Sequence, residues 1–326
     1  MKEKIIQYLE NSNNYVSGQK ISEDLHVSRT AVWKNINILR EEGYEIESST
    51  RRGYRLVRKP DVLSKGMLMR YLPEGVLPGE IHYYDSIDST NEEAKRCAAK
   101  GAPDGSLYFS DNQTAGKGRR GRSWASPKGE DVFFTLLLRP DILPQNISMV
   151  TLVSALAVRE AMSAYAGEQC QIKWPNDIIL HGKKMCGILT EMSMEMTDID
   201  YLVIGIGVNL NRHQFSDEIK EFASSVFLET GHRVERSHFL ADVLVAFRER
   251  YEKFLQTQDL SLLMDEYNQY LINVGRKVKI IKRDEELVRT AIGIDQRGNL
   301  LVEDDDGHRE SVFSGEVSVR GLYGYV

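Results

Sequence analysis

The sequence predicts an α+β protein of three domains: a winged helix-turn-helix at residues 1–60, a larger mixed domain at 67–270 and a small closed β-barrel at 273–326. Three observations predict this division. Helical periodicity gives way to two alternating strands before residue 58, strand-like runs and amphipathic helices share the middle of the chain, and only short strands separated by polar turns follow residue 273. A length of 326 residues is sufficient for two or three domains with substantial cores.

The helices of the first domain are predicted by apolar periodicity and by their caps. A first helix carries Ile5 and Leu9 on one face, and Gly18–Leu25 forms a short second helix. Ser28 can cap a third helix, whose apolar residues recur at helical spacing until Gly43 ends it. Such a trio of helices is typical of a helix-turn-helix, in which the third helix recognises DNA.

Two alternating strands, 44–49 and 53–57, follow the third helix and form a hairpin wing with two arginines in its turn. A recognition helix enters the major groove, while wing arginines reach phosphates or a minor groove. We therefore expect this domain to bind DNA; the alternatives are a protein-contact domain and, for Trp33, a place in the core. The residues expected to face DNA are Ser28, Arg29, Thr30, Trp33, Lys34, Asn37, Arg51 and Arg52.

The distribution of charge agrees with a single DNA-binding domain. Residues 1–60 carry eleven basic against eight acidic side chains, a balance of +3. Because the whole chain has a net charge of −6, the other 266 residues carry −9. An acidic body argues against nucleic-acid binding over the whole surface, so only the first domain is expected to meet a polyanion.

Cysteine, histidine and apolar patterning exclude several other classes of protein. Three cysteines without CxxC spacing predict reduced thiols in a cytoplasmic protein, and neither a disulfide nor a zinc framework. Seven scattered histidines predict no protein-built metal site, and the acidic turn at 304–306 is interpreted as a solvated hairpin tip. No signal peptide is recognisable, and no apolar run approaches the roughly 20 residues that span a bilayer. We expect no membrane contact.

The middle domain is predicted to be a sheet flanked by helices. Four strand-like runs joined by short turns predict an antiparallel meander, and two long segments have the apolar spacing of amphipathic helices. The predicted strands are 171–174, 178–180, 186–195 and 200–210, and the predicted helices are 149–166 and 239–256.

A basic, glycine-rich loop in this domain indicates an anionic ligand. The stretch Gln113–Trp124, "QTAGKGRRGRSW", combines four cationic residues with three glycines. It matches GxGxxG, and it nearly matches a P-loop, with Arg122 in the place of the lysine. Both motifs require a helix after the loop, whereas Pro127 and Gly129 break any helix and 132–138 has the pattern of a buried strand. Both nucleotide motifs are therefore rejected, and the anion must be identified from other residues.

Five segments place polar residues or glycines where a core strand is normally apolar. The five segments are "DSTN" (88–91), the basic loop, "KWPND" (173–177), "GKKMCGIL" (182–189) and "GIGVNLN" (205–211). In this combination and order, the chain resembles the bifunctional biotin protein ligase and biotin operon repressor of bacteria over its whole length. The resemblance implies a class II synthetase-like catalytic domain, shared with lipoate ligases, that contains an antiparallel-rich mixed sheet, followed by an SH3-like barrel.

The resemblance also implies a two-step reaction. The carboxylate of biotin attacks the α-phosphate of Mg²⁺–ATP, which gives biotinyl-5'-AMP and pyrophosphate, and a lysine of a biotin carboxyl carrier domain then displaces AMP. The basic loop would supply cations to the first transition state and close over the reactive adenylate. With the adenylate bound as corepressor, the protein is expected to form a homodimer through the central sheet and to bind a palindromic operator.

Individual roles follow from the resemblance. Lys184 is the catalytic lysine, Lys173 and Arg119 face the phosphate, Asp177 assists the incoming amine, and Mg²⁺ lies near Asn176 and Asp177. The implied biotin-binding residues are Ser89, Thr90, Asn91, Gln113, Lys117, Gly118, Arg119, Lys184, Gly187, Gly205 and Gly207. The implied nucleotide-binding residues are Arg119, Arg122, Trp124 (as a hinge contact), Lys173, Asn176, Asp177, Asn209 and Arg320.

Two departures from the family pattern affect these assignments. Lys117 stands where an arginine is more common, which keeps the charge but loses bidentate geometry. The stretch 222–231 has no tryptophan to cover adenine, so Phe222 or Phe227 is expected to replace it.

Three rival functions were weighed. A lipoate ligase is disfavoured by the winged domain and the basic loop. A non-catalytic, biotin-sensing repressor is disfavoured by Lys173, Lys184 and the loop cations, which serve only phosphoryl chemistry. A class II aminoacyl-tRNA synthetase would need a tRNA-binding surface, which the acidic body does not offer.

Overall fold

The structure is a computed structural model that divides into two compact units, Met1–Val62 and Leu63–Val326. Each unit is described by itself. The structure describes residues 1–12, 14–282, 285–314 and 318–321, with Arg120, Lys282, Glu285 and 318–321 as backbone only.

The first unit is a winged helix-turn-helix, which confirms the prediction. Ser28 caps the third helix, because its Oγ accepts a hydrogen bond from the backbone N of Ala31 at 3.1 Å. Val32, Ile36 and Leu39 of this helix are fully buried, and Gly43 follows its end with a φ of +92°. The elements are α1 (Lys2–Glu10), α2 (Gly18–Asp24), α3 (Arg29–Glu41) and the antiparallel hairpin of β1 (Glu45–Ser49) and β2 (Gly53–Arg58).

The sequence "RKPDVLSKG" (58–66) predicts a linker between the first two domains, and in the structure this linker is shorter. Strand β2 includes Arg58, and helix α4 (Lys65–Tyr71) begins at Lys65 with Ser64 as its N-cap. The irregular connection therefore covers only residues 59–64.

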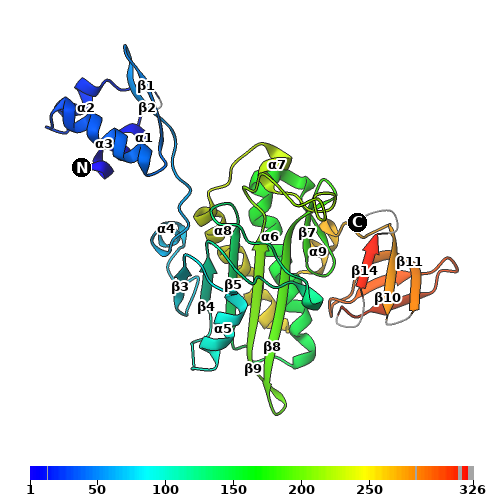
Figure 1. The fold of residues 1–326 in the computed structure, drawn as a ribbon. Helices are drawn as coiled ribbons and strands as arrows, with labels where there is room; N and C mark the ends of the chain where they lie inside the picture. Colours follow the sequence, from blue (N-terminus) through cyan, green and yellow to red (C-terminus); the bar gives the residue numbers. More distant parts are fainter. Residues whose placement is uncertain (13, 283–284, 315–317, 322–326) are drawn as a thin grey trace. The chain divides into compact units, whose positions relative to one another are not determined.

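The second unit is built on a seven-stranded mixed sheet (Figure 1). The last four strands pair in sequence order as the predicted antiparallel meander, and only β3 and β4 are parallel. In spatial order the strands are β3 (Ile81–Tyr84), β4 (Ser106–Ser110), β5 (Val132–Leu138), β9 (Asp198–Val208), β8 (Lys183–Glu195), β7 (Asp177–Leu180) and β6 (Gln171–Lys173).

Helices cover both faces of this sheet. Helices α6 (Ile147–Ala166) and α8 (Arg236–Thr257) pack together, and α6 packs on β6, β7 and β8. Helix α5 (Thr90–Ala98) packs on β4, β5 and β9. Shorter helices connect these elements: α7 (Val226–Thr230), α9 (Met264–Tyr270) and the 3-10 turns η1 (Arg119–Gly121), η2 (Pro144–Asn146) and η3 (Gly167–Gln169).

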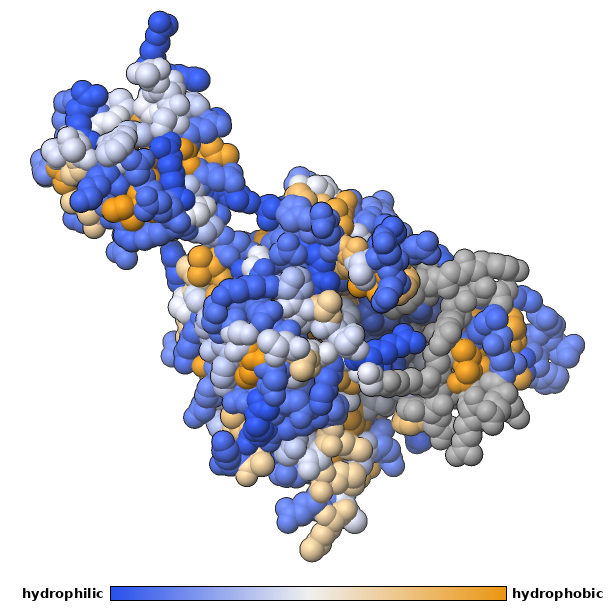
Figure 2. All heavy atoms as spheres, in the orientation of Figure 1, coloured by the Kyte–Doolittle hydropathy of each residue, from blue (hydrophilic) through white to orange (hydrophobic). Residues whose placement is uncertain are grey.

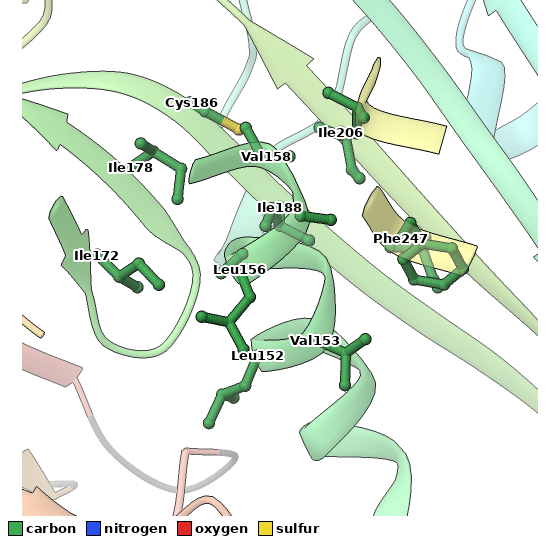
Figure 3. Close-up of a cluster of buried hydrophobic side chains, with 14 of the residues drawn as sticks. Leu152, Val153, Leu156, Val158, Ile172, Ile178, Cys186, Ile188, Ile206 and Phe247 are labelled. Atoms are coloured by element: carbon green, nitrogen blue, oxygen red, sulfur yellow. The ribbon is translucent and has the colours of Figure 1, made fainter. Parts of the chain in front are cut away.

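The alternation of side chains along β8 separates the core from the opposite face. Cys186 and Ile188 are buried against α6 residues such as Leu156, as Figure 3 shows. Thr190 continues this face and bonds Thr151 of α6 at 2.8 Å. Because successive strand residues point to opposite faces, Gly187, Leu189 and Glu191 face away from α6. The face away from α6 is the one that carries the candidate site.

The stretch Pro144–Gln169, which contains α6, is the one helical segment of the described chain that is long and apolar enough to cross a membrane. However, 78% of its most apolar window is buried inside the unit. It is the central core helix of the fold.

The third predicted domain is a five-stranded antiparallel sheet within the second unit. Its strands, in spatial order, are β13 (Arg309–Val312), β12 (Leu300–Glu303), β11 (Glu285–Ile294), β10 (Lys277–Lys282) and β14 (Ser318–Gly321). Among these described strands no pairing joins β13 to β14, so the closure of a barrel is not seen.

Trp174 connects this small sheet to the large one. Its side chain is 2% exposed, and its Nε1 donates to the backbone O of Gly298 at 3.0 Å. Its backbone N donates to Asn273 Oδ1, also at 3.0 Å. The tryptophan of "KWPND" is therefore a structural residue between two sheets, flanked on both sides by candidate site residues.

Candidate active site

One cavity collects the sequence motifs of the second unit. Its volume is about 690 Å³, and it lies on the face of the large sheet that α6 does not cover. Every predicted biotin-binding or nucleotide-binding residue except Arg320 lines it, although these residues come from five separate segments. Arg320 is in β14, and its side chain lies outside what the structure describes. The predicted lining residues are Ser89, Thr90, Asn91, Gln113, Lys117, Gly118, Arg119, Arg122, Trp124, Lys173, Asn176, Asp177, Lys184, Gly187, Gly205, Gly207 and Asn209.

Three glycines of β8 and β9 form one wall, which we call the glycine floor: Gly187, Gly205 and Gly207. Gly187 is directly opposite Gly207 in the sheet. A Cβ at Gly207 would lie 2.7 Å from Trp124 Nε1, and a Cβ at Gly187 would lie 2.9 Å from Trp124 Cζ3. The indole of Trp124 thus packs directly on the backbone of the sheet, which only glycine permits. The sequence suggested a hinge contact for Trp124, and the structure adds this floor contact.

A hydrogen-bond network holds the start of α5 next to the glycine floor. The backbone N of Thr90 donates to Gln113 Oε1 at 2.8 Å, and Gln113 Nε2 donates to Ser126 Oγ at 3.1 Å. The buried Thr135 hydroxyl is 2.9 Å from Thr90 Oγ1. These bonds fix the orientation of the polar groups at this end of the cavity before any ligand is present.

Asn91 supports the cavity from the side of the sheet. Its Oδ1 is 2.6 Å from Thr135 Oγ1, and its Nδ2 donates to Glu191 Oε2 at 2.8 Å. A Cβ at Gly205 would lie 2.1 Å from Asn91 Oδ1, so the amide occupies the space of the missing side chain. Both ends of the Asn91 amide are engaged by protein groups.

Cationic side chains surround the middle of the cavity. Lys184 Nζ is 2.5 Å from Asp177 Oδ1 and 5.4 Å from the centre of the Trp124 ring. Arg119 Nη1 donates to Asn176 Oδ1 at 2.8 Å. Lys173, only 6% exposed, is on the adjacent strand β6. An anion in this cavity would therefore meet several positive charges held in place by neighbouring groups.

The basic loop is itself a small hairpin. The backbone N of Trp124 donates to the O of Gly116 at 2.9 Å, and the N of Gly118 donates to the O of Arg122 at 2.7 Å. Lys117 Nζ lies 2.8 Å from Glu92 Oε1, which attaches the loop to α5. Arg119 Nη2 also donates to the backbone O of Ser314, so the loop touches the small sheet as well.

The far end of the cavity offers aromatic rings and a free acceptor. Asn209 Oδ1 is buried and has no hydrogen-bond partner within the described chain, whereas its Nδ2 donates to the backbone O of Ser224 at 3.1 Å. Phe222 and Phe215 line this end. Phe227 is not among the lining residues and packs edge-on against His213 instead. Of the two phenylalanines expected to cover a base, only Phe222 is in position.

A buried ion pair between Asp131 and Arg212 lies next to the end of the basic loop. Asp131 is fully buried, and Arg212 Nε donates to its Oδ2 at 2.8 Å. Burial raises the pKa of Asp131 to about 6, although Arg212 and the backbone N–H of Leu210 act in the opposite direction. The pair is therefore charged at neutral pH and costly to separate.

Several lining or supporting residues were missed by the sequence analysis. Thr135 could have been found, because it is the only polar residue in the apolar run Val132–Leu138. Glu191 and Arg212 had no such signal, because their partners are far away in the sequence. The missed residues discussed here are Ser126, Thr135, Glu191, Arg212 and Phe215.

No metal centre accompanies the cavity in the part of the chain that is described. The one group of metal-ligand type found there is Asp304, Asp306 and His308, in the turn between β12 and β13. Asp304 Oδ1 accepts from the backbone N of Asp306 and of His308, at 3.0 and 2.9 Å, so the carboxylate stabilises the turn itself. Cys97, Cys170 and Cys186 are free thiols.

The predicted DNA-facing residues form an exposed surface on the first unit. Trp33 is 57% exposed and therefore not part of the core. Ser28, Arg29, Thr30 and Lys34 are exposed beside it, and Asn37 is half-buried. In the wing, the Arg52 guanidinium stacks 4.3 Å from the centre of the Tyr15 ring, while Arg51 is exposed.

Comparison with known proteins matches each part of the chain to a separate family model. Residues 83–209 match the model of the Biotin/lipoate A/B protein ligase family, residues 2–55 match an HTH domain, and residues 274–320 match the Biotin protein ligase C terminal domain. A solved structure, the biotin protein ligase from Aquifex aeolicus in complex with biotin and ATP, is 29% identical with a TM-score of 0.65. It covers 74% of this chain and 99% of its own. The fold of the second unit is thus that of a biotin protein ligase.

Two curated relatives extend over all three domains. The bifunctional ligase/repressor BirA of Bacillus subtilis (strain 168) is 38% identical over 309 residues, which cover 94% of each chain. The protein of the same name from Escherichia coli (strain K12) is 29% identical over 320 residues, 97% of this chain and 96% of its own. The chain belongs to the family of bifunctional ligase/repressors.

The contact between Gly205 and Asn91 gives a first prediction. Gly205→Ala should lower the free energy of unfolding by about 1–3 kcal/mol, because the new Cβ overlaps the Asn91 amide. In Gly205→Ala/Asn91→Ala the loss should be smaller than the sum of the two single losses. Urea unfolding of the second unit measures all three variants.

Gly66→Ala is the matched control, since a Cβ there meets nothing within 4 Å and the residue is in helix α4. This variant should be neutral or slightly stabilising. Additive losses in the double variant would contradict the contact.

Proposed function

We propose that the protein is a biotin protein ligase that forms biotinyl-5'-AMP from biotin and ATP, transfers biotin to a lysine of a biotin-dependent carboxylase carrier domain, and represses transcription with the adenylate bound. The observation that carries this proposal is the cavity itself. It joins a polar pocket on the glycine floor to a cluster of cations. It also contains a buried acceptor, Asn209 Oδ1, to which an adenine amine could donate. The relatives named above carry the same pair of activities in their names.

The glycine floor suits a flat bicyclic ligand. Without side chains on Gly187, Gly205 and Gly207, the Trp124 indole and the Asn91 amide lie against the backbone of the sheet, and the cavity beside them has room for a flat ring system. Ser89 and Thr90 at the start of α5, together with Gln113 of the basic loop, offer hydroxyl, amide and backbone groups that match a cyclic urea. Asn91 supports this pocket by fixing Thr135 and the floor, since its amide bonds Thr135 and Glu191.

The cations suit the first chemical step. A carboxylate oxygen of biotin bonds to the α-phosphorus, and the bond from that phosphorus to pyrophosphate breaks. Negative charge concentrates on the oxygens around phosphorus, so catalysis requires positive groups held there in advance. Lys184 would contact the attacking carboxylate, and Lys173 and Arg119 would contact the phosphate. Asp177 holds Lys184 at 2.5 Å and so orients it before the substrates arrive.

The far end of the cavity suits the nucleotide. Asn209 Oδ1 is a buried acceptor, which an exocyclic adenine amine can satisfy. Phe222 would cover the base. Asn176 and Asp177 provide oxygen donors of the type that Mg²⁺ prefers, but two residues already bonded to Arg119 and Lys184 do not complete a site. They fit an ion that enters with ATP, where it would neutralise phosphate charge.

In the second step, a lysine amine of the carrier domain attacks the carbonyl carbon of the adenylate, and AMP leaves with the bridging oxygen. The amine must lose a proton as the amide forms. Asp177 would accept it, and its position beside Lys184 in the same cavity supports this role. The basic loop would exclude water from the mixed anhydride meanwhile.

ATP–pyrophosphate exchange tests the chemistry. The native protein should catalyse exchange with biotin and not with lipoate or without an acid. Lys184→Ala should reduce the rate by about 10²–10³-fold, because it removes a charge from the transition state. Lys183→Ala is the control, since Lys183 faces Glu229 outside the cavity.

Exchange with lipoate alone would assign the protein to the lipoate ligases. Binding of biotin without exchange would make it a non-catalytic sensor.

The wing and α3 support operator binding. Arg51 has no partner in the described part of the first unit, whereas Arg52 is stacked on Tyr15. We propose that Arg51 contacts a phosphate and that Trp33 and Arg29 approach base edges.

Arg51→Ala should therefore weaken operator binding and reduce the slope of log K against log [salt] by about one unit. Arg52→Ala should change the slope less, because part of its role is the stack on Tyr15. Fluorescence titrations at four salt concentrations give both slopes. Equal changes in the two variants would contradict the assignment.

The open edge of β8 supports a homodimer. Strand β7 pairs only with the first residues of β8, so the part of β8 beyond Ile188 has β9 as its one described neighbour. Met192 and Met194 are exposed there, and Figure 2 shows apolar side chains toward the projecting end of this hairpin. An open strand edge with apolar side chains can pair with a second copy. Two first units would then reach the two halves of a palindromic operator.

Sedimentation velocity with and without biotin plus ATP tests the dimer. The ligands should shift the protein toward dimer. The double variant Met192→Lys/Met194→Lys should weaken the dimer affinity at least tenfold in the presence of the ligands, because two copies would bring like charges together. Ligand-independent sedimentation would reject the corepressor role.

Three smaller assignments complete the proposal. The domain boundaries are placed at 1–60, 67–270 and 273–326. Free thiols support a reducing, cytoplasmic location. The acceptor is a carrier domain of a biotin-dependent carboxylase, as the names of further relatives suggest, such as the biotin–[acetyl-CoA-carboxylase] ligase of Paracoccus denitrificans, 32% identical over 239 residues.

A further inference from the structure

Arg212 connects segments of the site that are otherwise separate. It follows the "GIGVNLN" motif directly, is 5% exposed and lines the cavity. Its Nη2 donates to the backbone O of Ala125 at 2.7 Å, and Ala125 is the first residue after the basic loop. Its guanidinium also pairs with Asp131, just before strand β5.

The same residue contacts the segment that covers the nucleotide end. The Arg212 guanidinium stacks 4.9 Å from the centre of the Phe215 ring, and Phe215 lines the cavity. The backbone O of Arg212 accepts a hydrogen bond from Ser225 Oγ at 2.6 Å, and Ser225 is the N-cap of α7. The segment 213–225 is thus connected to Arg212 at both ends, by the chain itself at residue 213 and by the hydrogen bond from Ser225.

We infer that Arg212 is a positioning residue that couples closure of the basic loop to the nucleotide-covering segment 213–223. Ala125 directly follows Trp124, whose indole lies on the glycine floor. A shift of Ala125 therefore moves Trp124 and the loop cations with it. Arg212 fixes the position of Ala125 relative to Phe215. The basic loop and segment 213–223, which would both cover the adenylate, therefore stay at a constant distance from each other.

The geometry distinguishes this role from general stabilisation. Asp131 alone would satisfy the charge of a buried arginine, and its carboxylate already receives Arg212 Nε and the backbone N of Leu210. The additional bond to Ala125 O and the stack on Phe215 join the end of the basic loop to segment 213–223, and both segments line the cavity. A lysine at this position could pair with Asp131 but could not make all three contacts.

The inference depends on the proposed function, since it concerns retention of the adenylate. The experiment loads the full-length protein with biotin and ATP without an acceptor and measures release of adenylate and AMP from the filled site. It also measures KM for biotin and ATP, and the single-turnover rate of adenylate formation. The variants are Arg212→Met, Arg212→Lys and Phe215→Ala, and thermal unfolding reports their stability.

Arg212→Met should release the adenylate on the order of tenfold faster and raise both KM values on the order of tenfold, because a charge-assisted hydrogen bond to the loop is lost. The single-turnover rate at saturation should fall by less than about threefold, since Lys184 and Lys173 remain in place. Arg212→Lys and Phe215→Ala should have intermediate effects in the same direction. If Arg212→Met does not fold, adenylate release and KM in Arg212→Lys and Phe215→Ala decide whether the inference holds.

Arg250→Lys is the matched control. Arg250 is a buried arginine that bonds a carboxylate, Glu266, and a backbone carbonyl, Ala246 O, but it lies on α8 outside the cavity. Its variant can lose stability without a change in release rate. Native-like release and KM in folded Arg212 and Phe215 variants would overturn the inference, as would equally fast release from Arg250→Lys.

The two hypotheses fail in different ways. A native protein without biotin-dependent exchange would reject the proposed function. A native protein that is active, with variants that retain adenylate equally well, would reject only the role of Arg212.

Discussion

The site depends on the absence of side chains from one face of two neighbouring strands. Gly187 and Gly207 are paired across β8 and β9, and Trp124 packs on them at a distance that any Cβ would prevent. Gly205 leaves the space that the Asn91 amide occupies. Two segments far apart in the sequence, the basic loop and the start of α5, therefore approach the same backbone surface. The other lining residues of the cavity surround these two segments.

Charge in the cavity is arranged before any ligand enters. The chain is acidic overall, yet Lys184, Arg119 and Lys117 are placed together and each is held by a neighbouring oxygen. An anionic substrate would find these cations already oriented, so little reorganisation would remain for the transition state. The partners Asp177, Asn176 and Glu92 thus orient these cations.

The second unit also links the site to its surroundings. Trp174 holds the small sheet against the large one, and Arg119 reaches from the loop to Ser314, just after β13. Arg212 joins the loop end to Phe215 and the segment around it. The open edge of β8 begins directly after the glycine floor. A ligand that contacts the floor would therefore touch the loop, the segment 213–225 and the start of the open edge of β8 through the same cavity.

The sequence by itself determined the elements and the motifs. Ser28 as a helix cap, the wing and the meander of β6 to β9 were predictable because caps, periodicity and turn residues act over a few positions. The five motifs indicated the class of site through their resemblance to a known family. Even so, the linker was overestimated, because β2 and α4 extend into it.

Only the tertiary structure decided how the motif residues are used. It placed Trp124 on the glycine floor, engaged both ends of Asn91, and put Phe222 in the cavity and Phe227 outside it. It also joined Arg212 to Asp131 and Ala125, which are more than 80 positions away. Such contacts depend on sheet register and on packing between distant segments, and neither leaves a periodic signal in a single sequence.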